Sequence, residues 1–271
     1  MFSTPYLAAV IQMNSQTDLE QNLTQAYNFL QEAAEQGARV IGLPENFAFL
    51  GGLSMRMKRA DEIADRVPSF LSDTAKEFGI YLVGGSYPVP TPEGKVFNHA
   101  TVYSPEGEKL AGYNKVHLFD VELSDKEAYR ESDYVEPGEA KCVVLKDKRI
   151  GNWGLSVCYD LRFPEFYRKL VGEGAEIFSV PSAFTHTTGQ NHWKALLRAR
   201  AIENTCYVFA PAQTGLHGKN RKTWGHAMII DPWGAVLADA GREPGIAMAE
   251  ISPQRMKEVR SKIPSLEHRR F

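Results

Sequence analysis

Short apolar runs alternate with amphipathic helical patterns along nearly the whole chain, and this alternation constrains the fold more than any other feature. The apolar run at 6–12 is followed by a helical pattern with apolar residues from Leu19 to Ala33, and then by a second apolar run at 39–43. An alternation of strand and helix patterns of this kind is typical of an α/β fold.

Helix-capping signals divide these patterns into elements. Thr17-Asp-Leu-Glu20 matches a capping box and predicts the start of the first helix. Gly37 and Gly79 stand where a helix ends in the left-handed conformation that glycine adopts at little cost. The other expected strands are 80–83, 97–103, 109–113, 142–145 and 150–157, and the other expected helices lie around 71–78, 164–171, 193–201 and 253–263, the last with Met256, Val259 and Ile263 on its apolar face.

Two pairs of similar segments indicate an internal repeat. Residues 37–47 resemble residues 174–184, and residues 99–107 resemble residues 226–234. The alternative is chance similarity between strand–turn segments. We expect two related halves, about 6–115 and 142–250, within a single domain that spans 1–271. Two mixed sheets stacked face to face, each covered on its outer side by helices, would bury the apolar faces of both halves.

Composition excludes several classes of protein. Hydrophobic residues make up 43% of the 271 residues and charged residues 24%, which excludes a disordered, collagen-like or coiled-coil chain. Because 31 Lys and Arg stand against 33 Asp and Glu, the net charge is −2, and we expect binding neither to nucleic acid nor to a membrane surface. No apolar run approaches the ~18 residues that span a bilayer, and the first basic residue is Arg39, so we expect neither a membrane span nor a signal peptide.

The three cysteines, Cys142, Cys158 and Cys206, are too few and too widely spaced for a disulfide framework. No Cys-x-x-Cys pair is present, so we expect a reduced, cytoplasmic protein without a metal or cofactor. Cys142 and Cys206 lie within apolar strand patterns and are interpreted as structural. Cys158 instead lies at a strand-to-helix turn, where the partial positive charge of the helix N-terminus would lower the pKa of the thiol and favour the reactive thiolate.

Two charged residues lie at comparable strand ends. Glu45 ends an apolar run, and it would project from the same sheet edge as Cys158 because active groups of α/β sheets gather beyond the carboxyl ends of the strands. Lys115 follows a strand among apolar and aromatic neighbours, where a lysine is costly unless it is paired or functional. Taken alone, Glu45 fits a surface acid equally well, and Lys115 fits a surface lysine with a buried stem.

Together these residues match a known family. Pro44-Glu-Asn-Phe47, Tyr113-Asn-Lys-Val-His-Leu-Phe119 and Ser156-Val-Cys-Tyr-Asp-Leu-Arg-Phe-Pro-Glu165 resemble, in the same order, the motifs of the nitrilase superfamily of carbon–nitrogen hydrolases. The resemblance extends from the first strand to the tail at 268–270. It implies a four-layer α-β-β-α sandwich and a thiol-dependent amidase.

The resemblance also implies a role for each residue. Cys158 attacks the amide carbonyl carbon, and Glu45 transfers the protons. Lys115 and the backbone N–H of Tyr159 stabilise the oxyanion. The family uses a second glutamate between the lysine and the cysteine, and Glu131 matches its position; nearby competitors are Glu122, Glu127 and Glu136.

The implied substrate is a small carboxylate-bearing amide. Arg162 is the candidate cation for its carboxylate because a guanidinium binds a carboxylate through two hydrogen bonds, although pairing with Asp160 or Glu165 would explain it equally well. The resemblance places Phe184 and Thr188 along the pocket. Within the superfamily the chain is most similar to the Nit branch, and deaminated glutathione is the implied amide. An omega-amidase acting on 2-oxoglutaramate, or a nitrilase, would use the same catalytic residues.

Two different classes of function remain as alternatives. A papain-like Cys–His hydrolase would take its base from His117, His186, His192 or His226. A non-catalytic scaffold or binding protein would keep the fold without turnover. The family commonly forms dimers, and the tail at 263–271 mixes apolar and basic residues, so we expect a homodimer or higher homo-oligomer in which this tail packs on a partner copy.

Overall fold

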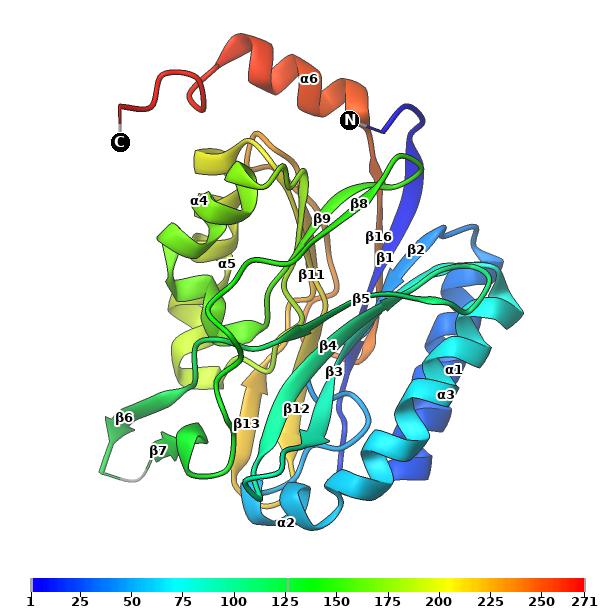
Figure 1. Ribbon diagram of the computed structural model, residues 1–271, viewed down its shortest axis with the longest axis vertical. Coiled ribbons are helices and arrows are strands. Elements are labelled where there is room, and N and C mark those ends of the chain that lie inside the picture. Colours follow the sequence, from blue (N-terminus) through cyan, green and yellow to red (C-terminus); the bar gives the residue numbers. More distant parts are fainter. Residues whose placement is uncertain (1, 126, 271) are drawn as a thin grey trace.

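Two mixed β-sheets lie at the centre of the molecule, and helices cover their outer faces (Figure 1). The computed structural model describes residues 2–125 and 127–270. Helices α1 (Leu19–Glu35) and α3 (Ala60–Phe78) cover one sheet, and α4 (Pro164–Gly172) and α5 (His186–Asn204) cover the other. The expected four-layer α-β-β-α sandwich is confirmed.

The first sheet has the order β13-β12-β1-β2-β3-β4-β5, and β16 also pairs with β1. Strands β1, β2 and β3 run parallel, and β3, β4 and β5 form an antiparallel meander. The strands are β1 (Tyr6–Met13), β2 (Val40–Gly42), β3 (Tyr81–Pro90), β4 (Val96–Tyr103), β5 (Lys109–Asn114), β12 (Ala212–His217), β13 (Arg221–Trp224) and β16 (Gly245–Ile251).

The second sheet repeats this topology. Its order, β15-β14-β11-β10-β9-β8, contains β9 to β11 in parallel, followed by antiparallel β14 and β15. The series β9-β10-β11-β14-β15 thus corresponds to β1-β2-β3-β4-β5, so the similar segments in the sequence belong to a structural repeat. The strands are β8 (Val144–Asp147), β9 (Gly151–Leu155), β10 (Ile177–Ser179), β11 (Tyr207–Ala210), β14 (Met228–Ile230) and β15 (Val236–Asp239).

Alternate residues of β1 contribute to two different cores. Ala8 and Val10 join Trp153 of the second sheet in the core between the sheets. Ala9 and Ile11 join the core beneath α1 and α3. A strand that is buried on both faces has a continuous apolar sequence. For this reason polar and apolar residues do not alternate along 6–12.

Several helix starts differ from the predicted elements. Asp18, not Thr17, caps α1, because its side chain accepts a hydrogen bond from the Gln21 N–H at 3.0 Å; the predicted capping box is wrong. Helix α3 begins at Ala60, well before the predicted start at 71, and no side chain caps it. The short α2 (Leu53–Lys58) was not predicted and also lacks a side-chain cap. Without a capping residue, the sequence gives no local sign of these starts.

The C-terminal helix and one hairpin extend from the sandwich. Helix α6 (Pro253–Lys262) ends before Ile263, whose side chain is 48% exposed rather than part of the predicted apolar face. Strands β6 (Asp120–Ser124) and β7 (Glu127–Arg130) form a separate two-stranded sheet that projects from the body of the molecule (Figure 1). Within the described residues, no helix combines the length and the apolar composition needed to cross a membrane.

His217 makes the stability of the fold depend on pH. Its buried ring has Nδ1 2.7 Å from the Ser15 carbonyl oxygen and Nε2 2.6 Å from Thr223 Oγ1. Burial lowers the pKa of His217 from 6.5 to about 4. Because the ring in the unfolded chain has the higher pKa, the unfolded state gains a proton first, and stability falls as the pH drops through the window between these two values.

We predict that His217 accounts for a loss of about 3 kcal/mol between pH 6.5 and pH 4. Urea unfolding at a series of pH values measures this loss. His217→Gln removes this part of the dependence of the unfolding free energy on pH. His268→Gln, at an exposed position, leaves that pH dependence unchanged. Equal slopes in the wild type and His217→Gln would contradict the assignment.

Candidate active site

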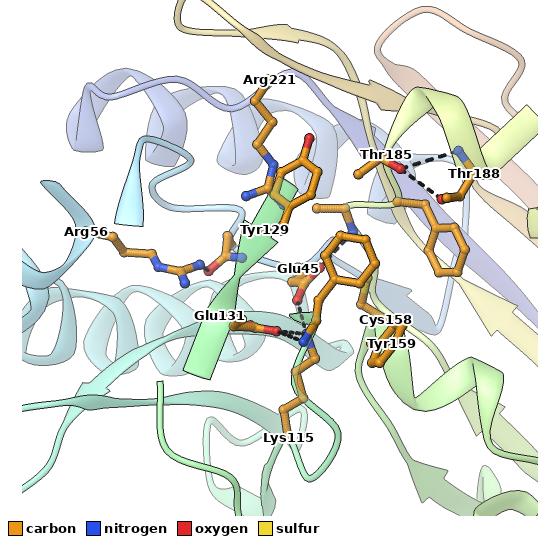
Figure 2. Close-up of a pocket in the computed structure, with 14 residues that line it drawn as sticks. Glu45, Arg56, Lys115, Tyr129, Glu131, Cys158, Tyr159, Thr185, Thr188 and Arg221 are labelled. Atoms are coloured by element: carbon orange, nitrogen blue, oxygen red, sulfur yellow. Dashed lines mark hydrogen bonds and ion pairs between the residues drawn. The ribbon is translucent and has the colours of Figure 1, made fainter. Parts of the chain in front are cut away.

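Lys115 is buried between two carboxylates (Figure 2). Its Nζ lies 2.7 Å from Glu131 Oε2 and 3.3 Å from Glu45 Oε1, and its side chain is 1% exposed. Asn98 Nδ2 donates to both acids, at 2.8 Å to Glu45 Oε1 and at 3.4 Å to Glu131 Oε1. One ammonium group and one amide therefore join the two carboxylates into a single buried network.

Glu45 is held by groups from both halves of the molecule. It follows β2, and its Oε2 accepts a hydrogen bond at 2.8 Å from the N–H of Ala183, which follows β10. The side chain of Gln213 donates to the Glu45 carbonyl oxygen at 3.1 Å. The site therefore lies where the carboxyl ends of the parallel strands of the two sheets meet.

Cys158 begins a short 3-10 helix, Cys158–Arg162, after β9. Its φ of 49° lies in the left-handed region, which costs free energy for a residue with a side chain and is maintained only where the surroundings fix it. The Cys158 N–H donates to the Pro181 carbonyl oxygen at 3.0 Å and anchors this conformation. The turn brings the Cys158 side chain into the pocket that Glu45 and Lys115 line.

The environment raises the pKa of the Cys158 thiol well above its ordinary value. Burial is the largest cause, and the negative charge of Glu45 adds to it, while Lys115 and the Ala183 N–H act in the opposite direction. The expectation that a helix N-terminus lowers this pKa is therefore wrong. Burial and the adjacent carboxylate set the direction of the shift, and helix α4 begins only at Pro164, six residues after Cys158. The resting group is the thiol.

The lysine and the two carboxylates of this network favour each other's ionised forms. Burial alone lowers the pKa of Lys115, but Glu131 and Glu45 outweigh burial and raise it above the ordinary value. Burial alone raises the pKa of Glu131, but Lys115 and Arg56 outweigh it and lower that pKa. Lys115 is thus an ammonium and Glu131 a carboxylate at neutral pH.

Asp160 connects the lysine segment to the cysteine turn. This fully buried carboxylate accepts hydrogen bonds from Tyr113 Oη at 2.8 Å and from the Val157 N–H at 2.8 Å. It also accepts from the His117 N–H at 3.1 Å and lies 2.7 Å from His117 Nδ1. Because Tyr113 and His117 flank Lys115 and Val157 precedes Cys158, Asp160 sets the position of the two segments relative to each other.

The pocket around these groups encloses about 540 Å³ of space between atoms, and part of that space is open to solvent. It is lined by seven of the residues that the sequence indicated: Glu45, Lys115, Glu131, Cys158, Tyr159, Phe184 and Thr188. Arg162 is not among the lining residues. Its guanidinium lies 5.7 Å and 5.4 Å from the ring centres of Tyr159 and Phe184 and 3.3 Å from His192 Nδ1.

No sequence pattern indicated several of the other lining residues. Arg56 comes from α2, Tyr129 from β7 and Arg221 from β13. None of them stands in a motif or at the end of a predicted strand, and α2 itself was not predicted. Only the three-dimensional structure brings these side chains to the pocket.

The papain-like alternative has no base in this pocket, because no histidine is found among its described lining residues. His117 pairs with Asp160, and His226 pairs with Asp239 at 2.9 Å. In residues 2–125 and 127–270, no three His, Cys, Asp or Glu side chains gather in a way that could hold a metal ion.

Comparison with known proteins identifies the family. Residues 7–261 match the family model described as carbon-nitrogen hydrolase. This chain belongs to the carbon–nitrogen hydrolase family. It is 52% identical to a deaminated glutathione amidase of Synechocystis sp., over 98% of this chain and 99% of that protein. It is 36% identical to an omega-amidase of Homo sapiens, over 98% of this chain and 96% of that protein.

Solved structures of this family have the same fold. The NitFhit protein of C. elegans matches 100% of this chain and 66% of its own longer chain, with 37% identity and a TM-score of 0.94. A mutant amidase from Nesterenkonia sp. AN1, in which acrylamide has added to the active-site cysteine, covers 97% of this chain and 99% of its own, with 28% identity and a TM-score of 0.81.

Glu45 and Lys115 have opposite effects on the pKa of the Cys158 thiol, so we predict that replacing them changes its reactivity in opposite directions. Glu45→Gln removes a charge that raises the Cys158 pKa, and Lys115→Met removes a charge that lowers it. At pH 7 the first variant is therefore alkylated faster by iodoacetamide than the wild type, and the second is alkylated more slowly. The change is roughly tenfold for each unit of pKa.

The measurement follows the peptide that contains Cys158 by mass spectrometry over a range of pH. The peptides with Cys142 and Cys206 serve as internal controls, since neither residue lines the pocket. Changes in the same direction for both variants would contradict the electrostatic account.

Proposed function

We propose that this chain is an amidase that hydrolyses a small carboxylate-bearing amide through a thioester on Cys158. The observation that supports this best is that a thiol, two carboxylates and an ammonium group line one pocket. Membership of a family of carbon–nitrogen hydrolases and 52% identity to a deaminated glutathione amidase agree with it.

In the first half-reaction the Cys158 thiol gives its proton to Glu45 as Sγ attacks the carbonyl carbon. A base is needed at this step because the thiol pKa is raised and little thiolate exists at rest. The tetrahedral oxyanion is stabilised by Lys115 Nζ and by the backbone N–H of Tyr159. When the carbon–nitrogen bond breaks, Glu45 returns the proton to the leaving nitrogen, and a thioester remains.

In the second half-reaction Glu45 takes a proton from water, and the oxygen attacks the thioester carbonyl. The same two donors stabilise the second oxyanion. As the carbon–sulfur bond breaks, the proton on Glu45 returns to Sγ, and the carboxylic acid leaves. Glu131 keeps Lys115 charged and oriented through the contact of 2.7 Å.

Deaminated glutathione is the substrate we favour. It and 2-oxoglutaramate present the same acyl group, a 2-oxo acid whose distal carboxyl is an amide, and they differ only in the amine that leaves. The omega-amidase alternative, suggested by the relative of that name, therefore requires the same site and a smaller leaving group. Phe184 and Thr188 are proposed to line the acyl or amine subsite. A contact between Arg162 and a substrate carboxylate remains a prediction.

The lysine provides the sharpest test of the mechanism. Lys115→Met removes an oxyanion donor, so we predict a loss of turnover of at least 10²–10³-fold. Glu131→Gln keeps the lysine but weakens its orientation, so we predict a smaller loss in kcat. Circular dichroism must show that both variants are folded. A folded Lys115→Met protein with wild-type kcat would refute the assignment.

A substrate panel separates the candidate functions. Release of 2-oxoglutarate is measured from deaminated glutathione and 2-oxoglutaramate, and release of ammonia from a simple nitrile, with Cys158→Ala as the control. We expect deaminated glutathione to have the highest kcat/KM. A preference for 2-oxoglutaramate would support the omega-amidase alternative, and a preference for the nitrile would support a nitrilase. No turnover together with a Cys158 that resists alkylation would support the scaffold alternative.

We also propose that the chain is a single domain, that it acts in the cytoplasm and that it forms homodimers. The exposed Ile263 at the end of α6 and the basic residues that follow it would pack on a partner copy. Light scattering at micromolar concentration tests the oligomer, and we expect twice the mass of one chain. A monomer would refute the dimer.

A further inference from the structure

The cationic residues that line the pocket outnumber the anionic ones. Among its described lining residues, Arg56, Lys115 and Arg221 are cationic, whereas Glu45 and Glu131 are anionic. Both carboxylates contact Lys115, at 3.3 Å and 2.7 Å. The two arginines therefore contribute the excess positive charge, and within the described residues neither forms an ion pair.

Arg56 is nearly fully buried, with 3% of its surface exposed. Its guanidinium donates to Asn46 Oδ1 at 2.8 Å, which is a neutral acceptor. Burial lowers the pKa of Arg56, and Arg221 adds to this effect while Glu131 and Glu45 oppose it. A buried guanidinium with a single neutral acceptor has donors left for a ligand.

Arg221 also lines this pocket, and one of its donors is unsatisfied. Its Nε is buried and has no hydrogen-bond partner among the described residues. The guanidinium lies 5.9 Å from the ring centre of Tyr129, which orients it without neutralising it. Figure 2 shows the Arg56 and Arg221 side chains reaching toward the middle of the pocket from different elements. Buried donors without acceptors are rare in folded proteins, so the Arg221 Nε points to a ligand that supplies the acceptor.

We propose that Arg56 and Arg221 together bind the carboxylate of the substrate's acyl chain and exclude substrates with an ammonium group beside that carboxylate. The inference rests on the proposed function and adds the origin of its selectivity. A carboxylate offers each guanidinium a charged acceptor and balances the excess positive charge. An ammonium group at the neighbouring carbon faces two arginines, while both pocket carboxylates contact Lys115. The pocket therefore takes 2-oxo or unsubstituted acids rather than α-amino acids.

Ligand binding to Cys158→Ala tests this inference without requiring turnover. Calorimetry compares three five-carbon amides: glutaramate with a carboxylate, glutamine with a carboxylate and an ammonium, and pentanamide with neither. We expect glutaramate to bind at least about tenfold more tightly than either of the others. Adding Arg221→Gln weakens glutaramate binding roughly 10- to 100-fold and changes pentanamide binding by less than about threefold.

Two further variants complete the experiment. Arg56→Lys keeps the charge but loses the planar fork, so it also weakens glutaramate binding. Arg66→Gln removes an arginine whose side chain is 52% exposed on α3, and it leaves all three affinities unchanged. Equal affinities for the three amides, or unchanged glutaramate binding in Arg221→Gln, would overturn the inference. Selective binding of glutaramate without turnover of any amide by the wild type would uphold the carboxylate site and refute the proposed amidase.

Discussion

One buried ammonium group between two carboxylates is the constraint on which the rest of this structure depends. An unpaired charge at this depth costs several kcal/mol, so Lys115 requires Glu45 and Glu131, and each acid requires the lysine. The three residues arrive from the end of β5, the end of β2 and the 3-10 helix that follows β7. Pairing them therefore also fixes how these separate segments meet beside the thiol.

The fold builds this site by repeating one topology and breaking its symmetry. Strand β2 of one sheet is followed by Glu45, whereas β10, its counterpart in the other sheet, is followed by Ser182. The segment after β10 supplies the Ala183 N–H that donates to Glu45. One half thus contributes the acid and the other contributes the donor that orients it. The repeated strands position the site, and the residues that differ between the two copies supply its functional groups.

Apolar runs and the internal repeat indicated the buried strands and the stacked sheets, because burial on both faces is visible in the local sequence. The central residues were predicted from the family motifs, because Glu45 and Lys115 taken alone fit surface positions equally well. Arg56 and Arg221 could not be predicted, because α2 has no capping residue and β13 is a short edge strand. The acidity of Cys158 was also predicted wrongly, since burial and a neighbouring carboxylate are properties of the folded pocket.

Capture of an acyl group by hydroxylamine tests the central claim most directly. If the acid forms through a thioester on Cys158, hydroxylamine competes with water at the second step, and the hydroxamate of the acyl group forms at the expense of the free acid. The account predicts this product in the wild type and its absence in Cys158→Ala. Turnover that yields only free acid at saturating hydroxylamine would mean that water attacks the amide directly, and the account would be wrong.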